Sequence, residues 1–137
     1  MSSLHRTFLI AALLAATPAA AETIPGARIV IIDGDTVALP GGERLRLLDI
    51  DAPESFRSSC EAELVAGLKA KERLRQLLRD QDVTIERSGR DRFKRTLGRL
   101  FTEDGDVGEI LLTERLALPY VPGRKAERDA HWCGGRR

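Results

Sequence analysis

Short apolar runs separated by turn residues dominate the chain from residue 27 onward. Ala27–Ile32 is rich in β-branched residues, Thr36–Leu39 is a second such run, and Glu43–Ile50 alternates between apolar and charged positions. Patterns of this kind are typical of strands. Because Asp33-Gly34 and Pro40-Gly41-Gly42 are turn sequences, we expect the three strands to form a meander.

A helical pattern follows the meander. Ser58 and Glu61 resemble a capping box, and leucines and alanines at helical spacing predict a helix that runs to about Arg79. We predict two further strands, at Val83–Arg87 and Leu97–Thr102. A second helix is predicted at Val107–Leu116, with Asp106 as its cap. The polar tail from Arg124 onward is compatible with a short helix. Five strands interrupted by a helix suggest a small closed barrel with helical cover.

The first 21 residues have the pattern of a secretory signal. Arg6 precedes the nine-residue apolar run Phe8–Ala16, and small residues end the segment before Glu22. A membrane anchor or a buried helix is the alternative, but spanning a bilayer takes about 20 apolar residues. We therefore expect residues 1–21 to be removed, and residues 22–137 to be exported as one domain without a membrane segment.

Export would place Cys60 and Cys133 in an oxidising compartment, where two cysteines are expected to form a disulfide. The alternative is a metal site that uses His131 and Cys133, but two neighbouring ligands are too few for such a site.

Composition narrows the class of protein. A chain of 137 residues that is 42% hydrophobic and 31% charged is globular rather than disordered. Its 22 basic and 21 acidic residues give a net charge of +1, so no overall field attracts polyanions. Four of the basic residues are lysines and the other 18 are arginines, which pair with phosphate through two nitrogens. A phosphate-bearing partner would therefore have to be bound by local charge.

Three acids are candidates for chemistry. Asp35 opens the second strand, and Asp51 and Glu54 follow the third. In an antiparallel pair the start of one strand lies beside the end of the other, so we expect Asp35 and Asp51 to meet at one rim of the sheet. A cation such as Ca²⁺ would relieve the repulsion between their carboxylates. The alternative is that these acids only form turns, as Asp104-Gly105-Asp106 does.

Arginines accompany the acids. Arg46 lies on the third strand, and the run Arg90–Thr96 carries four positive charges and one negative charge. A cation flanked by arginines is the arrangement that phosphoryl transfer needs. The alternative is that these arginines are solvated surface residues.

Taken in order, three motifs resemble the staphylococcal nuclease (thermonuclease) family. They are Asp33–Thr36 after a strand, Arg46–Glu54, and Asp91–Leu97 followed by the Asp104-Gly105 turn. The resemblance spans roughly Ala27–Tyr120. It implies an α+β fold with a five-stranded OB-fold barrel and about three helices, and Ca²⁺-dependent cleavage of DNA and RNA.

The resemblance also implies roles for individual residues. Ca²⁺ would be bound by the carboxylates of Asp35 and Asp51 and by the backbone carbonyl of Ala52. Catalysis would fall to Arg46, Glu54 and Arg95, with Glu54 orienting or deprotonating the attacking water and the arginines binding phosphate.

Some positions depart from the family pattern. Asp49 adds an acid near the site, and Lys94 stands where the family usually has Gly. Tyr120 is the only tyrosine, which predicts weaker stacking on a base.

Our leading hypothesis is an exported, periplasmic or extracellular, Ca²⁺-dependent nuclease of low sequence specificity, with monomer as the default state. The alternatives are a catalytically weak or inactive OB-fold module that binds single-stranded nucleic acid or a protein, and a small structural domain held by Cys60–Cys133. The set of acids and arginines favours the enzyme, because a module that only binds would not need it.

Overall fold

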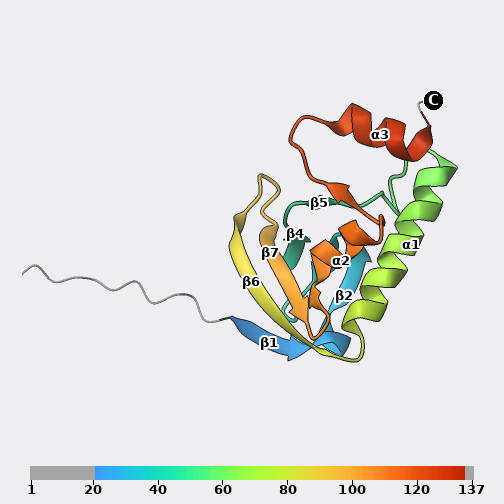
Figure 1. Ribbon diagram of the computed structural model, residues 1–137. Helices are drawn as coiled ribbons and strands as arrows, with labels where there is room; N and C mark the ends of the chain where they lie inside the picture. The colour runs from blue at the N-terminus through green and yellow to red at the C-terminus, as the bar shows by residue number, and fades with distance from the viewer. Residues whose placement is uncertain (1–20, 135–137) are drawn as a thin grey trace, which may run out of the picture.

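The computed structural model describes residues 21–134 (Figure 1). The expected signal at residues 1–21 therefore lies outside the described residues, apart from Ala21. The strands are β1 (Glu22–Pro25), β2 (Val30–Asp33), β3 (Thr36–Ala38), β4 (Arg44–Leu47), β5 (Ile50–Asp51), β6 (Asp82–Arg90), β7 (Thr96–Thr102), β8 (Gly105–Asp106) and β9 (Leu118–Pro119). The helices are the 3₁₀ turn η1 (Gly26–Arg28), α1 (Glu61–Leu78), α2 (Val107–Thr113) and α3 (Lys125–Cys133).

One curled sheet forms the body of the protein (Figure 1). Its strands are ordered β1-β6-β7-β4-β3-β2, with β8 added to β7, while β5 and β9 pair separately. Strands β4 and β7 run parallel and the other pairs are antiparallel. The α+β, OB-fold class predicted from the sequence is confirmed. Within residues 21–134 no ladder joins β1 to β2, so the sheet is curled without being closed by hydrogen bonds.

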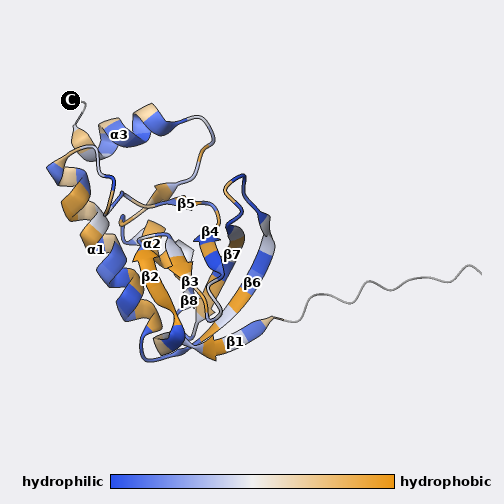
Figure 2. Cartoon of the chain, turned by 180° about the vertical axis from the view of Figure 1, so that it is seen from behind, coloured by the Kyte–Doolittle hydropathy of each residue, from blue (hydrophilic) through white to orange (hydrophobic). Residues whose placement is uncertain are grey.

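Aliphatic side chains from the sheet and from α1 and α2 form the core. Val37, Leu45 and Leu100 on the strands and Leu74 on α1 have no exposed surface. Alternation along β4 explains its contribution, because Leu45 and Leu47 point inward while Arg44 and Arg46 point outward. Figure 2 shows the resulting change between hydrophobic and hydrophilic positions along α1 and the strands.

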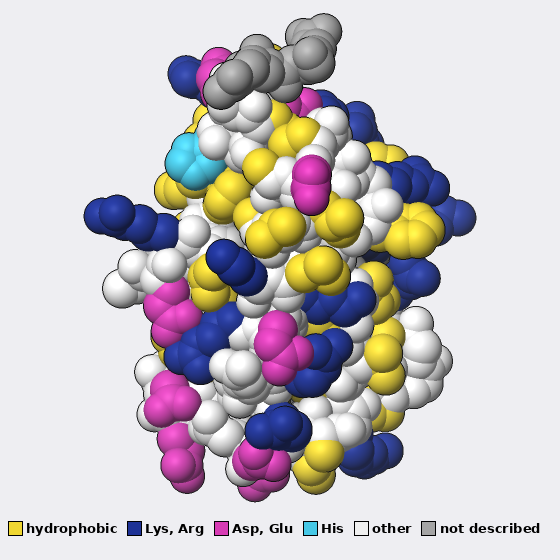
Figure 3. Space-filling model, turned by 90° about the vertical axis from the view of Figure 1, so that its right-hand side faces the viewer, with side chains coloured by type: hydrophobic (Ala, Val, Ile, Leu, Met, Phe, Trp, Pro, Cys, Tyr) yellow, Lys and Arg dark blue, Asp and Glu magenta, His cyan; other side chains and the backbone are white. Residues whose placement is uncertain are grey.

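Helix α1 differs from its predicted boundaries and buried face. Its N-cap is Cys60 rather than Ser58, and the Cys60 sulfur accepts a hydrogen bond from the Glu63 amide. The helix turns Glu63 and Gly67 toward the loop that carries Glu54 and leaves Leu68 51% exposed, so not all of the leucines at helical spacing lie on its buried face. Figure 3 shows the α1 and α3 side of the protein, where hydrophobic side chains lie among charges of both signs.

The third predicted strand is divided. Asp49 has a φ of 63°, a left-handed conformation that ends β4 before the chain begins β5. Strand β5 then leaves the main sheet and pairs with β9. The short helix expected in the tail is present as α3, and Asp106 caps α2 as predicted.

None of the helices in the described part of the chain is both long and apolar enough to cross a membrane.

Candidate active site

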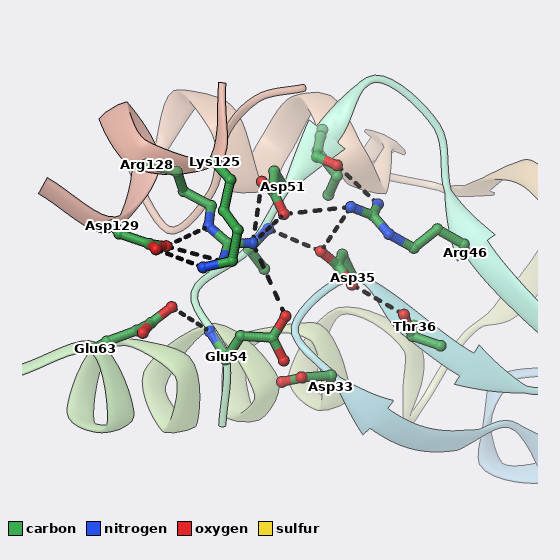
Figure 4. A network of polar contacts seen from close by, with 12 residues as sticks. Asp33, Asp35, Thr36, Arg46, Asp51, Glu54, Glu63, Lys125, Arg128 and Asp129 are labelled. Atoms are coloured by element: carbon green, nitrogen blue, oxygen red, sulfur yellow. Dashed lines mark hydrogen bonds and ion pairs between the residues drawn. The ribbon is translucent and has the colours of Figure 1, made fainter. Parts of the chain in front are cut away.

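Asp35 and Asp51 meet around the guanidinium of Arg46 (Figure 4). The Nη2 atom of Arg46 lies 3.2 Å from Asp35 Oδ2 and 3.4 Å from Asp51 Oδ1. Its Nη1 atom donates to the carbonyl oxygens of Leu47 and Ile50, at 2.7 and 2.8 Å. The backbone of the β4–β5 segment therefore fixes the arginine that joins the two acids.

The strand pairing explains why the acids converge. Asp35 lies in the turn between β2 and β3, and β3 pairs with β4 so that Thr36 stands opposite Arg46. The Asp35 carbonyl accepts a hydrogen bond from the Leu47 amide at 2.8 Å, and the Asp35 carboxylate accepts one from the Ala52 amide, also at 2.8 Å. The structure thus brings together Asp35, Asp51 and Ala52, the three residues that the family resemblance implies as Ca²⁺ ligands.

Glu54 lies beside this group on a loop held by α1. Its backbone amide donates to the carboxylate of Glu63 at 3.3 Å, and the same carboxylate accepts the Ser59 amide at 2.6 Å. Gly67 lets the helix approach closely, because a Cβ at this position would lie 2.6 Å from the carbonyl carbon and oxygen of Glu54. Glu63, which is fully buried, and Gly67 thus position the Glu54 loop.

Burial shifts the pKa values of two acids of the site, Asp35 and Glu54. Removal from water raises the pKa of Asp35 above its ordinary value, against the opposing charge of Arg46. Burial also raises the pKa of Glu54, and the nearby charges of Asp33 and Asp35 act in the same direction. A carboxylate with a raised pKa is a stronger proton acceptor, which suits Glu54 to activating a water.

Arg95 stands apart from the acids in the turn between β6 and β7. It directly precedes β7, whose Leu97 pairs with Arg46 of the neighbouring strand β4. Its Nε atom donates to Asp91 Oδ2 at 2.7 Å, and its guanidinium lies 5.5 Å from the centre of the Phe93 ring. Among the described contacts, none joins Arg95 to Asp35, Asp51 or Glu54.

The departures from the family pattern have distinct structural outcomes. Asp49 points to Arg99, with which it forms an ion pair, and does not join the acid cluster. Lys94 has a φ of 64°, a conformation that glycine adopts without strain. Tyr120 is half exposed, and the Arg46 guanidinium lies 5.9 Å from its ring centre.

The donor set suits a hard cation in its chemistry. Asp35 and Asp51 present carboxylate oxygens in a partly buried position, and Ca²⁺ binds such oxygens together with carbonyls and waters. Within residues 21–134, no group of three His, Cys, Asp or Glu side chains has a ready-made metal-binding arrangement, so water would have to complete the coordination.

Two features of the site region concern α3. Cys60 and Cys133 form a disulfide, which confirms the predicted pair and removes Cys133 as a metal ligand beside His131.

Arg128, in the middle of α3, reaches Asp51 and Glu54, and sequence reasoning did not identify it. It was hidden because it lies in a polar tail, 77 residues from Asp51, with no motif around it.

Comparison with known proteins places the chain. The family model described as staphylococcal nuclease homologue matches residues 44–132. The chain belongs to the staphylococcal nuclease homologue family. The matched residues include Arg46, Asp51, Glu54 and Arg95, while Asp35 lies just before them.

Curated relatives in and around this family carry nuclease names for the most part. A micrococcal nuclease of Shigella flexneri is 30% identical over 132 residues, which are 88% of this chain and 71% of that protein. An uncharacterized endonuclease of Escherichia coli O157:H7 is 30% identical over 75% of this chain and 65% of its own length. The succinoglycan biosynthesis protein ExoI of Rhizobium meliloti is 36% identical over 76% of this chain and 56% of its own length. The chain thus spans about half to two thirds of most of these relatives.

Proposed function

We propose that this member of the staphylococcal nuclease homologue family is an exported, Ca²⁺-dependent nuclease that hydrolyses phosphodiester bonds of DNA and RNA. The observation that carries the proposal is the meeting of Asp35 and Asp51 at the Arg46 guanidinium, with Glu54 close by, because Arg128 contacts both Asp51 and Glu54. The nuclease names of two of its relatives support the same reaction class. The Cys60–Cys133 disulfide supports an oxidising compartment, and therefore export.

The residues divide the chemistry among them. Asp35 and Asp51, with the Ala52 carbonyl, would hold Ca²⁺, which when bound neutralises charge on the non-bridging phosphate oxygens. Glu54 accepts a proton from the attacking water as the new oxygen–phosphorus bond forms. The phosphorus–oxygen bond to the leaving group breaks in line with that attack.

The arginines bind the phosphate on which charge grows. Arg46 is fixed by two backbone carbonyls, so its position costs no reorganisation during the reaction. The described hydrogen bonds of the Arg95 side chain use only its Nε atom, so its terminal nitrogens can bind a phosphate at the start of β7, the strand next to β4. Because every nucleotide carries the same phosphate, these contacts impose little sequence preference.

Digestion of DNA and RNA by the purified protein tests the proposal. With Ca²⁺ present we expect digestion, and a chelator should abolish it. Glu54→Gln should lower the turnover number by about a hundredfold or more, because the amide cannot accept the proton. Glu86→Gln, a matched change at an exposed residue of β6, should leave turnover unchanged.

Two results would contradict the proposal. Digestion by Glu54→Gln at the wild-type rate would remove the role given to Glu54. Binding of single-stranded DNA without cleavage, in Ca²⁺, would favour a non-catalytic OB-fold module instead.

A further inference from the structure

Arg128 brings a second guanidinium to the acid cluster from outside the sheet (Figure 4). Its Nη1 atom lies 3.3 and 3.4 Å from the two carboxylate oxygens of Asp51 and 3.9 Å from Glu54 Oε1. The Arg128 side chain is only 15% exposed. A largely buried arginine that touches two of the proposed functional acids is therefore part of the site's charge balance.

The two arginines are held in different ways. Arg46 is bound to backbone carbonyls as well as to acids. The Arg128 side chain contacts only carboxylates among the described hydrogen bonds, with Asp129 Oδ1 accepting from its Nε and Nη2 atoms at 3.3 and 3.1 Å. Arg46 is thus a fixed part of the sheet, whereas Arg128 can leave Asp51 without breaking a backbone contact.

Helix α3 sets where Arg128 lies. The helix packs against α1, and Cys133 in its last turn is bonded to Cys60, the N-cap of α1. Helix α3 therefore presents Arg128 to Asp51, although Asp35, Asp51 and Glu54 all lie outside this helix.

We infer that Arg128 is a built-in counter-ion that competes with a divalent cation for Asp51. The inference rests on the proposed function, in which Asp51 is a cation ligand. Calcium lies 2.3–2.6 Å from its ligand oxygens, so a cation on Asp51 and a guanidinium 3.3 Å from the same carboxylate repel each other strongly. Arg128 neutralises the acids while no cation is bound, and it must move away from Asp51 when one binds.

Calorimetric titration of the intact, disulfide-bonded protein with calcium chloride tests this competition. Arg128→Gln should lower the Kd for Ca²⁺ by about tenfold, because the competing charge is removed. Arg124→Gln, which removes the same charge from an exposed residue beside the same helix, should leave the Kd unchanged. Arg128→Lys keeps a charge and should give a smaller gain than Arg128→Gln.

A second variant tests the inference without altering Arg128 itself. Asp129→Asn removes a carboxylate that shares the guanidinium with Asp51, so Arg128 pairs more strongly with Asp51 and Ca²⁺ binding should weaken, the opposite of the effect of Arg128→Gln. Thermal unfolding of each variant checks that the fold is retained.

The outcomes separate this inference from the proposed function. Ca²⁺ binding by Arg128→Gln that is no tighter than wild type, or an equal gain in Arg124→Gln, overturns the competition. If a chelator stops digestion by the wild type but Arg128→Gln does not change the Kd for Ca²⁺, the competition inference fails and the nuclease function stands. If Arg128→Gln binds Ca²⁺ more tightly while no variant digests nucleic acid, the nuclease function alone fails.

Discussion

At the scale of single residues, the turn that carries Arg95 contains a conformation its sequence does not favour. Lys94 has a φ of 64°, while its amide donates to the Asp91 carbonyl at 3.0 Å and the Asp91 amide donates to the Arg95 carbonyl at 3.0 Å. The Cβ of a non-glycine residue clashes with the backbone in this region. The usual family glycine at this position therefore has a physical reason, and Lys94 occupies it at a cost.

Lys94→Gly should raise the free energy of unfolding by about 1 kcal/mol, because glycine adopts the left-handed conformation without that cost. Urea unfolding measures the change. Arg92→Gly, in the same turn but at a residue without positive φ, is the matched control and should lower stability. Equal destabilisation by both changes would show that the Lys94 conformation carries no strain.

The site residues that the sequence predicted belong to motifs that follow one another along the chain. Asp35 and Asp51 could be expected together because antiparallel pairing brings a strand's start beside its neighbour's end. Glu63 and Arg128 could not be named in this way. An acid in a helix's first turn ordinarily faces solvent near the positive end of the helix dipole, and nothing in a polar tail indicates which acid it will meet.

At the scale of elements, one ion-pair network joins segments at the edge of the sheet. Arg87 of β6 bonds both oxygens of Glu43, which precedes β4, and also pairs with Glu22 of β1. Thr96, the first residue of β7, donates to Glu43 at 2.7 Å. Hydrogen bonds from Arg87 are the main cause that lowers the pKa of Glu43 from its ordinary 4.5 to about 2.

This network predicts a dependence of stability on pH. A carboxyl group whose pKa is lower in the folded state stabilises the fold fully above its unfolded pKa of 4.5, and the contribution is lost as pH falls toward 2. Glu43→Gln should therefore lower the free energy of unfolding at neutral pH, by about 1 kcal/mol for a partly exposed pair. Urea unfolding should show that wild type and variant converge as pH approaches 2. A difference that stays constant with pH would mean that Glu43 acts by packing alone.

Most element positions followed from the pattern of apolar residues, and the exceptions have specific causes. The run Glu43–Ile50 alternates like one strand, but the left-handed Asp49 divides it and sends β5 to pair with β9. Strand β1 was not predicted, because its residues Glu22–Pro25 are mostly exposed and are held by pairing with β6. Cysteine is not a typical N-cap residue, so Ser58 was the more probable choice from sequence.

At the scale of the whole molecule, the disulfide links elements that are far apart in sequence. Cys60 and Cys133 are separated by 73 positions, and their bond ties the end of α3 to the start of α1. A cross-link that closes a long loop restricts the unfolded chain, and the loop-closure treatment gives about 4 kcal/mol for a separation of this size.

Replacing both cysteines by serine should lower the free energy of unfolding by about 4 kcal/mol. Serine is a good N-cap, so Cys60→Ser keeps a side-chain acceptor at the start of α1 and the loss reports the cross-link. Differential scanning calorimetry measures the change, with wild type under reducing conditions as the comparison. An intact mass that gains no hydrogens on reduction would show that the bond is not formed in the isolated protein.

The absence of a side chain at Gly67 has a consequence for how this site could vary. The backbone of the loop that carries Glu54 fills the space where a Cβ at residue 67 would stand. Helix α1 therefore sets how close Glu54 lies to the other acids. Any larger residue at 67 would lift Glu54 away from its neighbours while every charged group was still present. The reach of the proposed base toward its water is thus controlled from a position that carries no chemistry of its own.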